Sequence, residues 1–308
     1  MYPSTLTTQI KMQELMYQPT GNAERGRIHS YHSKPSPRVL NVGAHKKDIQ
    51  KLKCIEVWDT DLYVSKYAIG MEVEKNSLHR GAVKEYALFC GFETDRSCGY
   101  EAVTNILPLL PPSYWRNKVF NMMHEASKII DDTFSPSDNT CGGHISVSVR
   151  GMSGYDLMEK VRNYMGLIYA LYPKRLNNGY CNGNLRLTRS GSTRDWVNGA
   201  GWHGASRYAV INPSSDYMEI RIPTRFTSVN QMMRRYELMF QLVDSAVRGS
   251  SFKTFLIRAK PILMMQYNQD VAKVERVLEM AVHFQNYIKT GKVHESIVLY
   301  VPSNRDNN

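Results

Sequence analysis

The sequence predicts an α+β protein in which a curved, mainly antiparallel sheet is backed by helices. Two observations carry this prediction. Three segments alternate polar and apolar residues as half-buried strands do, and longer segments around them space apolar residues three and four positions apart, as amphipathic helices do. At 308 residues the chain is long enough for one large domain with appendages or for two domains.

The predicted elements follow one another from about residue 64 onward. The expected strands are residues 66–75, 142–151 and 217–223. The expected helices are residues 113–134, 152–173, 229–249 and 269–289. Ser153 precedes the second helix with Asp156 three positions on, which is a typical helix cap.

Composition divides the chain into three parts. Residues 1–55 are predicted to form a basic, irregular arm, residues 56–255 the main domain with the predicted sheet, for which the resemblance described below implies catalysis, and residues 256–308 a helical extension. A net charge of +11 indicates an anionic partner, which could be a nucleic acid, a nucleotide or an acidic substrate. The arm could contact nucleic acid or be a solvated tail, and charge alone does not decide between these roles.

Location is suggested by what the sequence lacks. The first residues do not have the pattern of a secretory signal, and no apolar run approaches the roughly 18 residues of a membrane span. Five cysteines, an odd number without a CxxC pair, are typical of a reducing compartment. We therefore expect a cytoplasmic protein that does not enter a membrane.

Carboxylates occur at strand positions that would bring them together. Glu72 and Glu74 are two residues apart, so both side chains leave the same face of a strand, with α-carbons roughly 7 Å apart. Like charges this close need a cation between them unless they are fully solvated, and oxygen ligands suit Mg²⁺ or Mn²⁺. A pair of surface glutamates on an edge strand is the alternative interpretation. A hairpin turn after Asp95 would bring Glu101 alongside them.

Two further strands add other ligand types. Glu219 and Arg221 share a strand face, where the carboxylate could hold a metal and the guanidinium a phosphate, or the two could form an ordinary ion pair. His144 lies at the start of another strand, on its polar side with Ser146, and Gly142 and Gly143 before it leave room for a ligand. A histidine at such a position can equally be structural.

The order of these motifs resembles a known superfamily. GxExE, a DxS…GxE segment, GGHxxVS and N…ExR follow one another over about residues 67–225. This order is similar to that of the glutamine synthetase-like carboxylate-amine ligases, and most of all to the amidoligases found in bacterial and phage gene sets. Residues 173–184 also look like the arginine-plus-YC segment of that family.

The resemblance implies a glutamine synthetase-like sheet that presents ligands to ATP and two or three divalent ions. It implies that Glu74 and Glu101 hold one ion, and that Glu72, His144 and Glu219 hold the ion nearest the transferred phosphate. The residues expected to contact ATP or an acyl phosphate are Arg207, Arg221, His144 and Ser146. Asp95 matches an aspartate of the family, but its neighbour is Arg96 where glycine is usual. Ser146 stands where related sequences often have a second histidine.

The predicted activity is ATP-dependent amide formation through an acyl phosphate, with Asp95 or Glu93 as the base that deprotonates the amine. The acceptor could be an amino acid, a peptide, a polyamine or a protein side chain, and a phage-encoded enzyme would act in the host cytoplasm. Two alternatives remain at this point. The core could have become a nucleic-acid-binding or structural module, or it could transfer phosphate without forming an amide. The sequence predicts no oligomeric state.

Overall fold

The computed structural model describes residues 38–40, 54–59, 62–78, 80–95, 97–178, 181–182 and 209–301. Most of the predicted arm and Arg207 therefore lie outside the described residues. The division at residues 55 and 255 stays a prediction. None of the described helices is long and apolar enough to cross a membrane.

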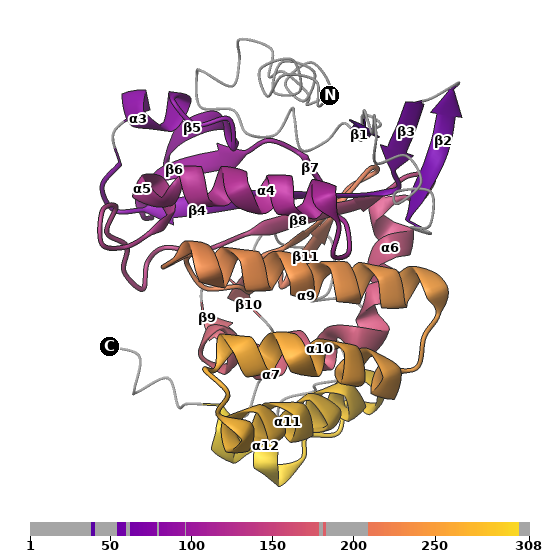
Figure 1. Ribbon diagram of the computed structural model, residues 1–308. Coiled ribbons are helices and arrows are strands. Elements are labelled where there is room, and N and C mark those ends of the chain that lie inside the picture. The colour runs from indigo at the N-terminus through magenta and orange to yellow at the C-terminus, as the bar shows by residue number, and fades with distance from the viewer. Residues whose placement is uncertain are drawn as a thin grey trace.

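A seven-stranded sheet forms the centre of the described protein (Figure 1). The strand order is β11-β12-β8-β4-β6-β5, β7 also pairs with β4, and each of these pairings is antiparallel. The strands are β4 (Tyr67–Lys75), β5 (Phe89–Asp95), β6 (Gly99–Thr104), β7 (Leu107–Pro108), β8 (Ile145–Val149), β11 (Ile211–Pro213) and β12 (Met218–Ile220).

Two smaller sheets accompany the central one. One has the order β1-β3-β2 and the other pairs β9 with β10, all antiparallel. Their strands are β1 (Arg38–Leu40), β2 (Ile55–Asp59), β3 (Leu62–Ser65), β9 (Asn177–Asn178) and β10 (Cys181–Asn182). β1 lies within the segment predicted to be an irregular arm.

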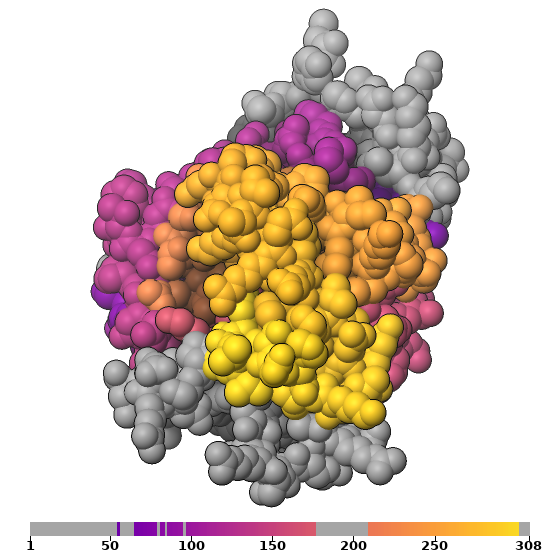
Figure 2. Space-filling model, turned by 90° about the horizontal axis from the view of Figure 1, so that it is seen from below, coloured from indigo at the N-terminus to yellow at the C-terminus, as the bar shows by residue number. Residues whose placement is uncertain are grey.

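In Figure 1, α9, α10 and α11 lie one after another below the sheet, and α4 lies across the sheet at the height of the strands. α4 and α9 lie nearest the sheet, α10 packs on α9, and α11 packs on α10, α7 and α12. In Figure 2 the C-terminal helices cover much of the side seen from below. The helices are α3 (Arg80–Lys84), α4 (Tyr114–Glu125), α5 (Ser127–Ile130), α6 (Gly154–Val161), α7 (Met165–Leu171), α9 (Val229–Arg248), α10 (Phe252–Gln266), α11 (Val271–Thr290) and α12 (Glu295–Tyr300).

The α+β prediction, an antiparallel sheet backed by helices, is confirmed, with differences at the helix boundaries. The pattern over 113–134 divides into α4 and α5 at Ala126, and that over 152–173 is interrupted by a 3-10 turn at Arg162–Tyr164. α10 begins at Phe252, before the helical extension predicted from residue 256, and continues through Pro261. The three predicted strands correspond to β4, β8 and β12, but β8 and β12 are shorter than predicted, so His144 and Arg221 lie just outside them.

The two faces of β4 have different surroundings. The Tyr67 hydroxyl donates to Asp244 of α9 over 3.4 Å, which places the odd-numbered residues of β4 toward the helices. Ile69, Met71 and Val73 on this face are fully buried in the core. Because side chains alternate along a strand, Glu72 and Glu74 project from the opposite face of the sheet.

Candidate functional site

A row of glutamates crosses three neighbouring strands. Glu74 of β4 lies directly opposite Glu101 of β6, and Glu101 lies opposite Glu93 of β5. Directly opposed residues share a face of the sheet, so three carboxyl groups are neighbours on one face. The predicted hairpin between Asp95 and Gly99 is confirmed, but it pairs β6 with β5 and places Glu101 opposite Glu93. Glu101 reaches Glu74 through the separate pairing of β6 with β4.

On the edge of β4 away from β6, the neighbouring strands β8 and β12 bring in His144 and Glu219. Ser146 of β8 lies opposite both Gly70 of β4 and Glu219 of β12. His144, just before β8, accepts a backbone hydrogen bond from Glu72 at 3.0 Å. The antiparallel register therefore fixes the imidazole between the carboxylates of β4 and β12.

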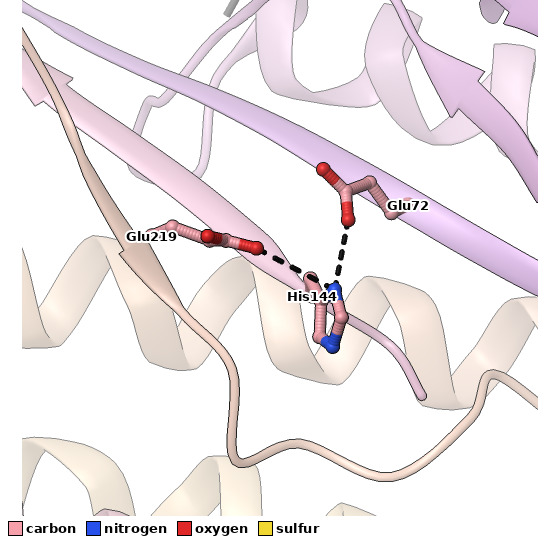
Figure 3. Close-up of side chains that lie close together, drawn as sticks. All are labelled: Glu72, His144 and Glu219. Carbon is pink, nitrogen blue, oxygen red and sulfur yellow. Dashed lines mark hydrogen bonds and ion pairs between the residues drawn. The ribbon is translucent and has the colours of Figure 1, made fainter. Parts of the chain in front are cut away.

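Figure 3 shows Glu72 and Glu219 pointing toward the imidazole of His144. His144 Nδ1 lies 2.9 Å from Glu72 Oε2, 3.5 Å from Glu219 Oε1 and 3.6 Å from Glu74 Oε1. Ligand atoms of Glu72, His144 and Glu219 all lie within 4.8 Å of one another. Each of these residues is less than 10% exposed, so water does little to screen their charges.

Burial and mutual repulsion shift the protonation of this cluster. Burial, followed by the charges of Glu72 and Glu74, raises the pKa of Glu101 well above its ordinary value of 4.5. Burial and the charge of Glu72 also raise the pKa of Glu219, against the opposing effect of Arg221. Burial would lower the pKa of His144, but the hydrogen bond to Glu72 and the nearby carboxylates outweigh it and raise that pKa. Without a cation, the site therefore retains protons.

Arg221 stands beside the cluster. Its Nη1 lies 2.5 Å from Glu219 Oε1, while Asn212 Nδ2 donates to Glu219 Oε2 over 3.4 Å. Nearby, burial and the charges of Glu219 and Glu72 raise the pKa of Tyr217 to about 12. The tyrosine is thus a neutral hydroxyl at physiological pH, and Arg221 is the cation next to the metal-capable carboxylates.

The residues present are suited to a divalent cation. Buried carboxylates and one imidazole form a ligand set that Mg²⁺ and Mn²⁺ accept. Oε1 of Glu101 is buried and has no hydrogen-bond partner among the described residues, as expected of an oxygen that awaits a cation. The raised pKa values of Glu101 and Glu219 point the same way, because a bound cation would offset both the burial and the neighbouring charges that raise them.

The predicted site residues fall into two groups. The structure brings together Glu72, Glu74, Glu101, His144 and Glu219, with Ser146 and Arg221 beside them. Asp95 lies opposite Gly99 at the turn of the hairpin, and its side chain is not among those described. Arg207 lies outside the described residues. The assignment of particular roles stays a prediction.

Two contributions to this site were not predicted. The backbone N–H of Gly142 donates to Glu74 Oε2 at 2.5 Å, and the buried guanidinium of Arg175 lies close to the same glycine. In the sequence, Gly142 and Gly143 suggested only room for a ligand, and the hydrogen bond from Gly142 to Glu74 was not expected. Arg175 belongs to the segment 173–184 that carried part of the family resemblance, yet nothing in the local pattern predicted its position.

Comparisons with known proteins give little further information. No protein-family model matches the sequence, and no curated protein matches it. Among solved structures, one match is to the crystal structure of the complex between the prokaryotic ubiquitin-like protein Pup and its ligase PafA, with 11% sequence identity and a TM-score of 0.33. It covers 73% of this chain and 65% of that one, which is less than two thirds of its length.

Proposed function

We propose that this protein is an ATP-dependent carboxylate-amine ligase that forms an amide through an acyl phosphate. The convergence of Glu72, Glu219 and His144 in a buried, metal-capable cluster is the observation that carries this proposal. The order of the motifs, which resembles that of the amidoligases, supports the same reaction class. An inert scaffold would gain nothing from keeping like-charged carboxylates buried together.

The residues of the cluster would divide the work of binding. Glu72, His144 and Glu219 would hold one divalent ion, and Glu74 and Glu101 would contribute to a second. When bound, Mg²⁺ or Mn²⁺ supplies positive charge that offsets the charge developing on the transferred phosphoryl group. Arg221 would contact that group from the side of Glu219, where its guanidinium already lies.

The chemistry proceeds in two steps. An oxygen of the substrate carboxylate attacks the γ-phosphorus of ATP, the bond from that phosphorus to the β-phosphate oxygen breaks, and ADP leaves. The nitrogen of the amine then attacks the acyl carbon, phosphate leaves, and the nitrogen loses a proton. Asp95 or Glu93 would accept this proton. Because the carboxylate oxide is a poor leaving group by itself, the phosphorylation step is what makes amide formation feasible.

Calorimetric titration of the full chain with the non-hydrolysable analogue AMP-PNP and Mg²⁺ tests the nucleotide site. We expect Mg²⁺-dependent binding that Glu219→Gln weakens by about a hundredfold or more, since even outer-shell partners of a metal contribute about ten- to a hundredfold. Glu125→Gln, on the exposed end of α4, is the matched control and should bind as the wild type does. A folded wild type that binds no nucleotide would contradict the proposal.

Mass spectrometry then separates the reaction classes. Incubation with Mg·ATP and a panel of carboxylates and amines should release ADP and phosphate and give a product whose mass is that of an amide. ADP with a phosphorylated acceptor and no amide would instead identify a phosphotransferase. Nucleic-acid affinity that falls steeply with salt and survives Glu219→Gln, without nucleotide binding, would identify a binding module.

A further inference from the structure

Two cysteines that the proposed reaction does not use lie next to each other in the fold. Cys98 is in the turn of the hairpin that joins β5 and β6, and Cys141 ends the loop that leads to His144. The side chains of the two cysteines are hydrogen-bonded to one another, and both are buried. Two thiols that are distant in the sequence are therefore within hydrogen-bond reach.

The end of β4 holds the two cysteine-bearing segments in place. Asn76 Nδ2 donates to the backbone oxygen of Cys98 over 3.3 Å, and the Asn76 N–H donates to Pro136 O over 2.9 Å. The backbone N–H of Cys141 donates to Asp138 O over 3.1 Å. Because the backbone is fixed on both sides, the closeness of the thiols is a property of the fold and not of one side-chain rotamer.

Cys54 provides a comparison, because it is also a buried thiol. Burial, the main cause, raises the pKa of Cys54 to about 12. The pKa of Cys141 is instead lowered, chiefly by the hydrogen bond with Cys98 and against the effect of burial. The thiolate is the form of cysteine that reacts with oxidants, so Cys141 is the more reactive of these two buried thiols.

Metal binding is another use that proteins make of paired cysteines. A structural zinc site takes four ligands. Among the residues that the structure describes, the one group of three or more metal-capable side chains is Glu72, His144 and Glu219. In that part of the chain the two thiols have no third ligand, which favours redox chemistry over a metal site.

We propose that Cys98 and Cys141 form a redox-active pair that hydrogen peroxide converts into a disulfide. The Cys141 thiolate attacks one oxygen of the peroxide, the O–O bond breaks, and a sulfenic acid and hydroxide form. The sulfur of Cys98 then attacks the sulfur of Cys141, the S–O bond breaks, and the departing hydroxide leaves as water with the proton of Cys98. In total two thiols lose two electrons, and one peroxide is reduced to two molecules of water.

The disulfide would connect two segments that carry residues of the carboxylate cluster. Cys98 is three residues before Glu101, and Cys141 is three residues before His144. Gly142, which follows Cys141, donates its N–H to Glu74 Oε2. The pair is thus a modification site beside the cluster, and its oxidation does not depend on whether the cluster binds a nucleotide.

Titration of the free thiols of the full chain tests this inference. The reduced protein has five cysteines. After hydrogen peroxide, catalase and unfolding in guanidinium chloride, the wild type should have lost two thiols, and dithiothreitol should restore them. Cys141→Ser should lose none of its remaining thiols under the same treatment. Cys54→Ser, the matched control at another buried cysteine, should lose two as the wild type does.

Mass spectrometry without reduction identifies which cysteines are joined. Trypsin places Cys98 in the peptide 97–116 and Cys141 in the peptide 129–150. We expect a species with the mass of both peptides less two hydrogens, which disappears on reduction. Thermal unfolding confirms that each variant is folded, and Cys98→Ser replaces Cys141→Ser if the latter does not fold.

Three results would overturn the inference. The first is a folded wild type that keeps all its thiols in peroxide. The second is a loss of thiols without the linked peptides, or with the link found only in disulfide-bonded dimers on a non-reducing gel. The third is a folded Cys141→Ser or Cys98→Ser variant that loses two thiols as the wild type does. None of these results bears on the proposed ligase activity, which nucleotide binding tests separately.

Discussion

Two buried charged sites lie on opposite faces of the same strand, β4, and they differ in how their charges are compensated. Lys75, on the helix side, is fully buried and donates to Ile130 O at 2.7 Å, Asp132 Oδ1 at 2.7 Å and Phe226 O at 2.9 Å. Glu74, the residue before it, faces a cluster in which glutamates oppose one another and Glu101 Oε1 has no hydrogen-bond partner among the described residues.

This difference in compensation indicates that Lys75 stabilises the fold, whereas the glutamates are suited to binding a ligand. The three donors of Lys75 meet three acceptors from distant segments, so this ammonium joins α5 and the residues before α9 to the sheet. The glutamates are also buried, but Glu101 Oε1 has no hydrogen-bond partner among the described residues, and we propose that a bound cation completes their environment. Full compensation predicts a loss of stability on substitution, and incomplete compensation predicts a loss of binding.

The largest expected effect on stability concerns the compensated side. Lys75→Met should lower the free energy of unfolding by about 3 kcal/mol, because two backbone oxygens and Asp132 lose their partner. Chemical denaturation measures this value, with Lys128→Met on the exposed surface as the control. A change below about 1 kcal/mol would mean that the two faces do not differ as we describe.

A smaller effect of opposite sign is expected on the other face. In EDTA at pH 8, Glu101→Gln should raise the free energy of unfolding by an amount on the order of 1 kcal/mol, because the buried carboxyl must either ionise beside Glu72 and Glu74 or take up a proton on folding, whereas the amide stays neutral. Denaturation with Glu125→Gln as the exposed control measures this. A substantial loss of stability would show that the carboxylate of Glu101 is structurally required.

The smallest effect is a pH dependence of the unliganded protein. The folded-state pKa values of Glu101 and Glu219 are raised from 4.5 and that of His144 is raised from 6.5, so the folded state binds more protons than the unfolded state above those values. The stability that these groups contribute is therefore lost as pH rises through the raised pKa values. In EDTA, the free energy of unfolding should fall between pH 5.5 and pH 8.

The variant Glu101→Gln serves as the internal control for this pH dependence. Its free energy of unfolding should fall less than that of the wild type over the same pH range, since one of the raised groups is gone. A wild-type stability that rises between pH 5.5 and pH 8, or identical slopes for the two proteins, would contradict our description of the cluster.

Sequence patterns predicted the local parts of this site. Period-two alternation placed Glu72 and Glu74 on one face, and the turn after Asp95 predicted the hairpin of β5 and β6 that carries Glu93 and Glu101. These relations depend on residues close in the chain or on the fixed geometry of a strand. For the same reason, the polar character of the face that carries His144 was predicted correctly.

Other parts of the site could not be read from local patterns. The contact of His144 with Glu72 depends on the register between β4 and β8, which are distant in sequence, and the family resemblance suggested it where periodicity could not. Arg175 ends a 3-10 turn that has no periodic signal. Lys75 looks like a solvated residue at a strand end, and only the packing of remote segments around it reveals its burial.

The central claim is that Glu72, His144 and Glu219 hold a divalent cation. Titration of the metal-free full chain with Mn²⁺, followed by the electron paramagnetic resonance signal of free Mn²⁺, tests it most directly. We predict saturable loss of the free-ion signal for the wild type and for Glu125→Gln, and little loss for Glu219→Gln. Equal binding by all three folded proteins, or no binding by the wild type, would contradict the claim.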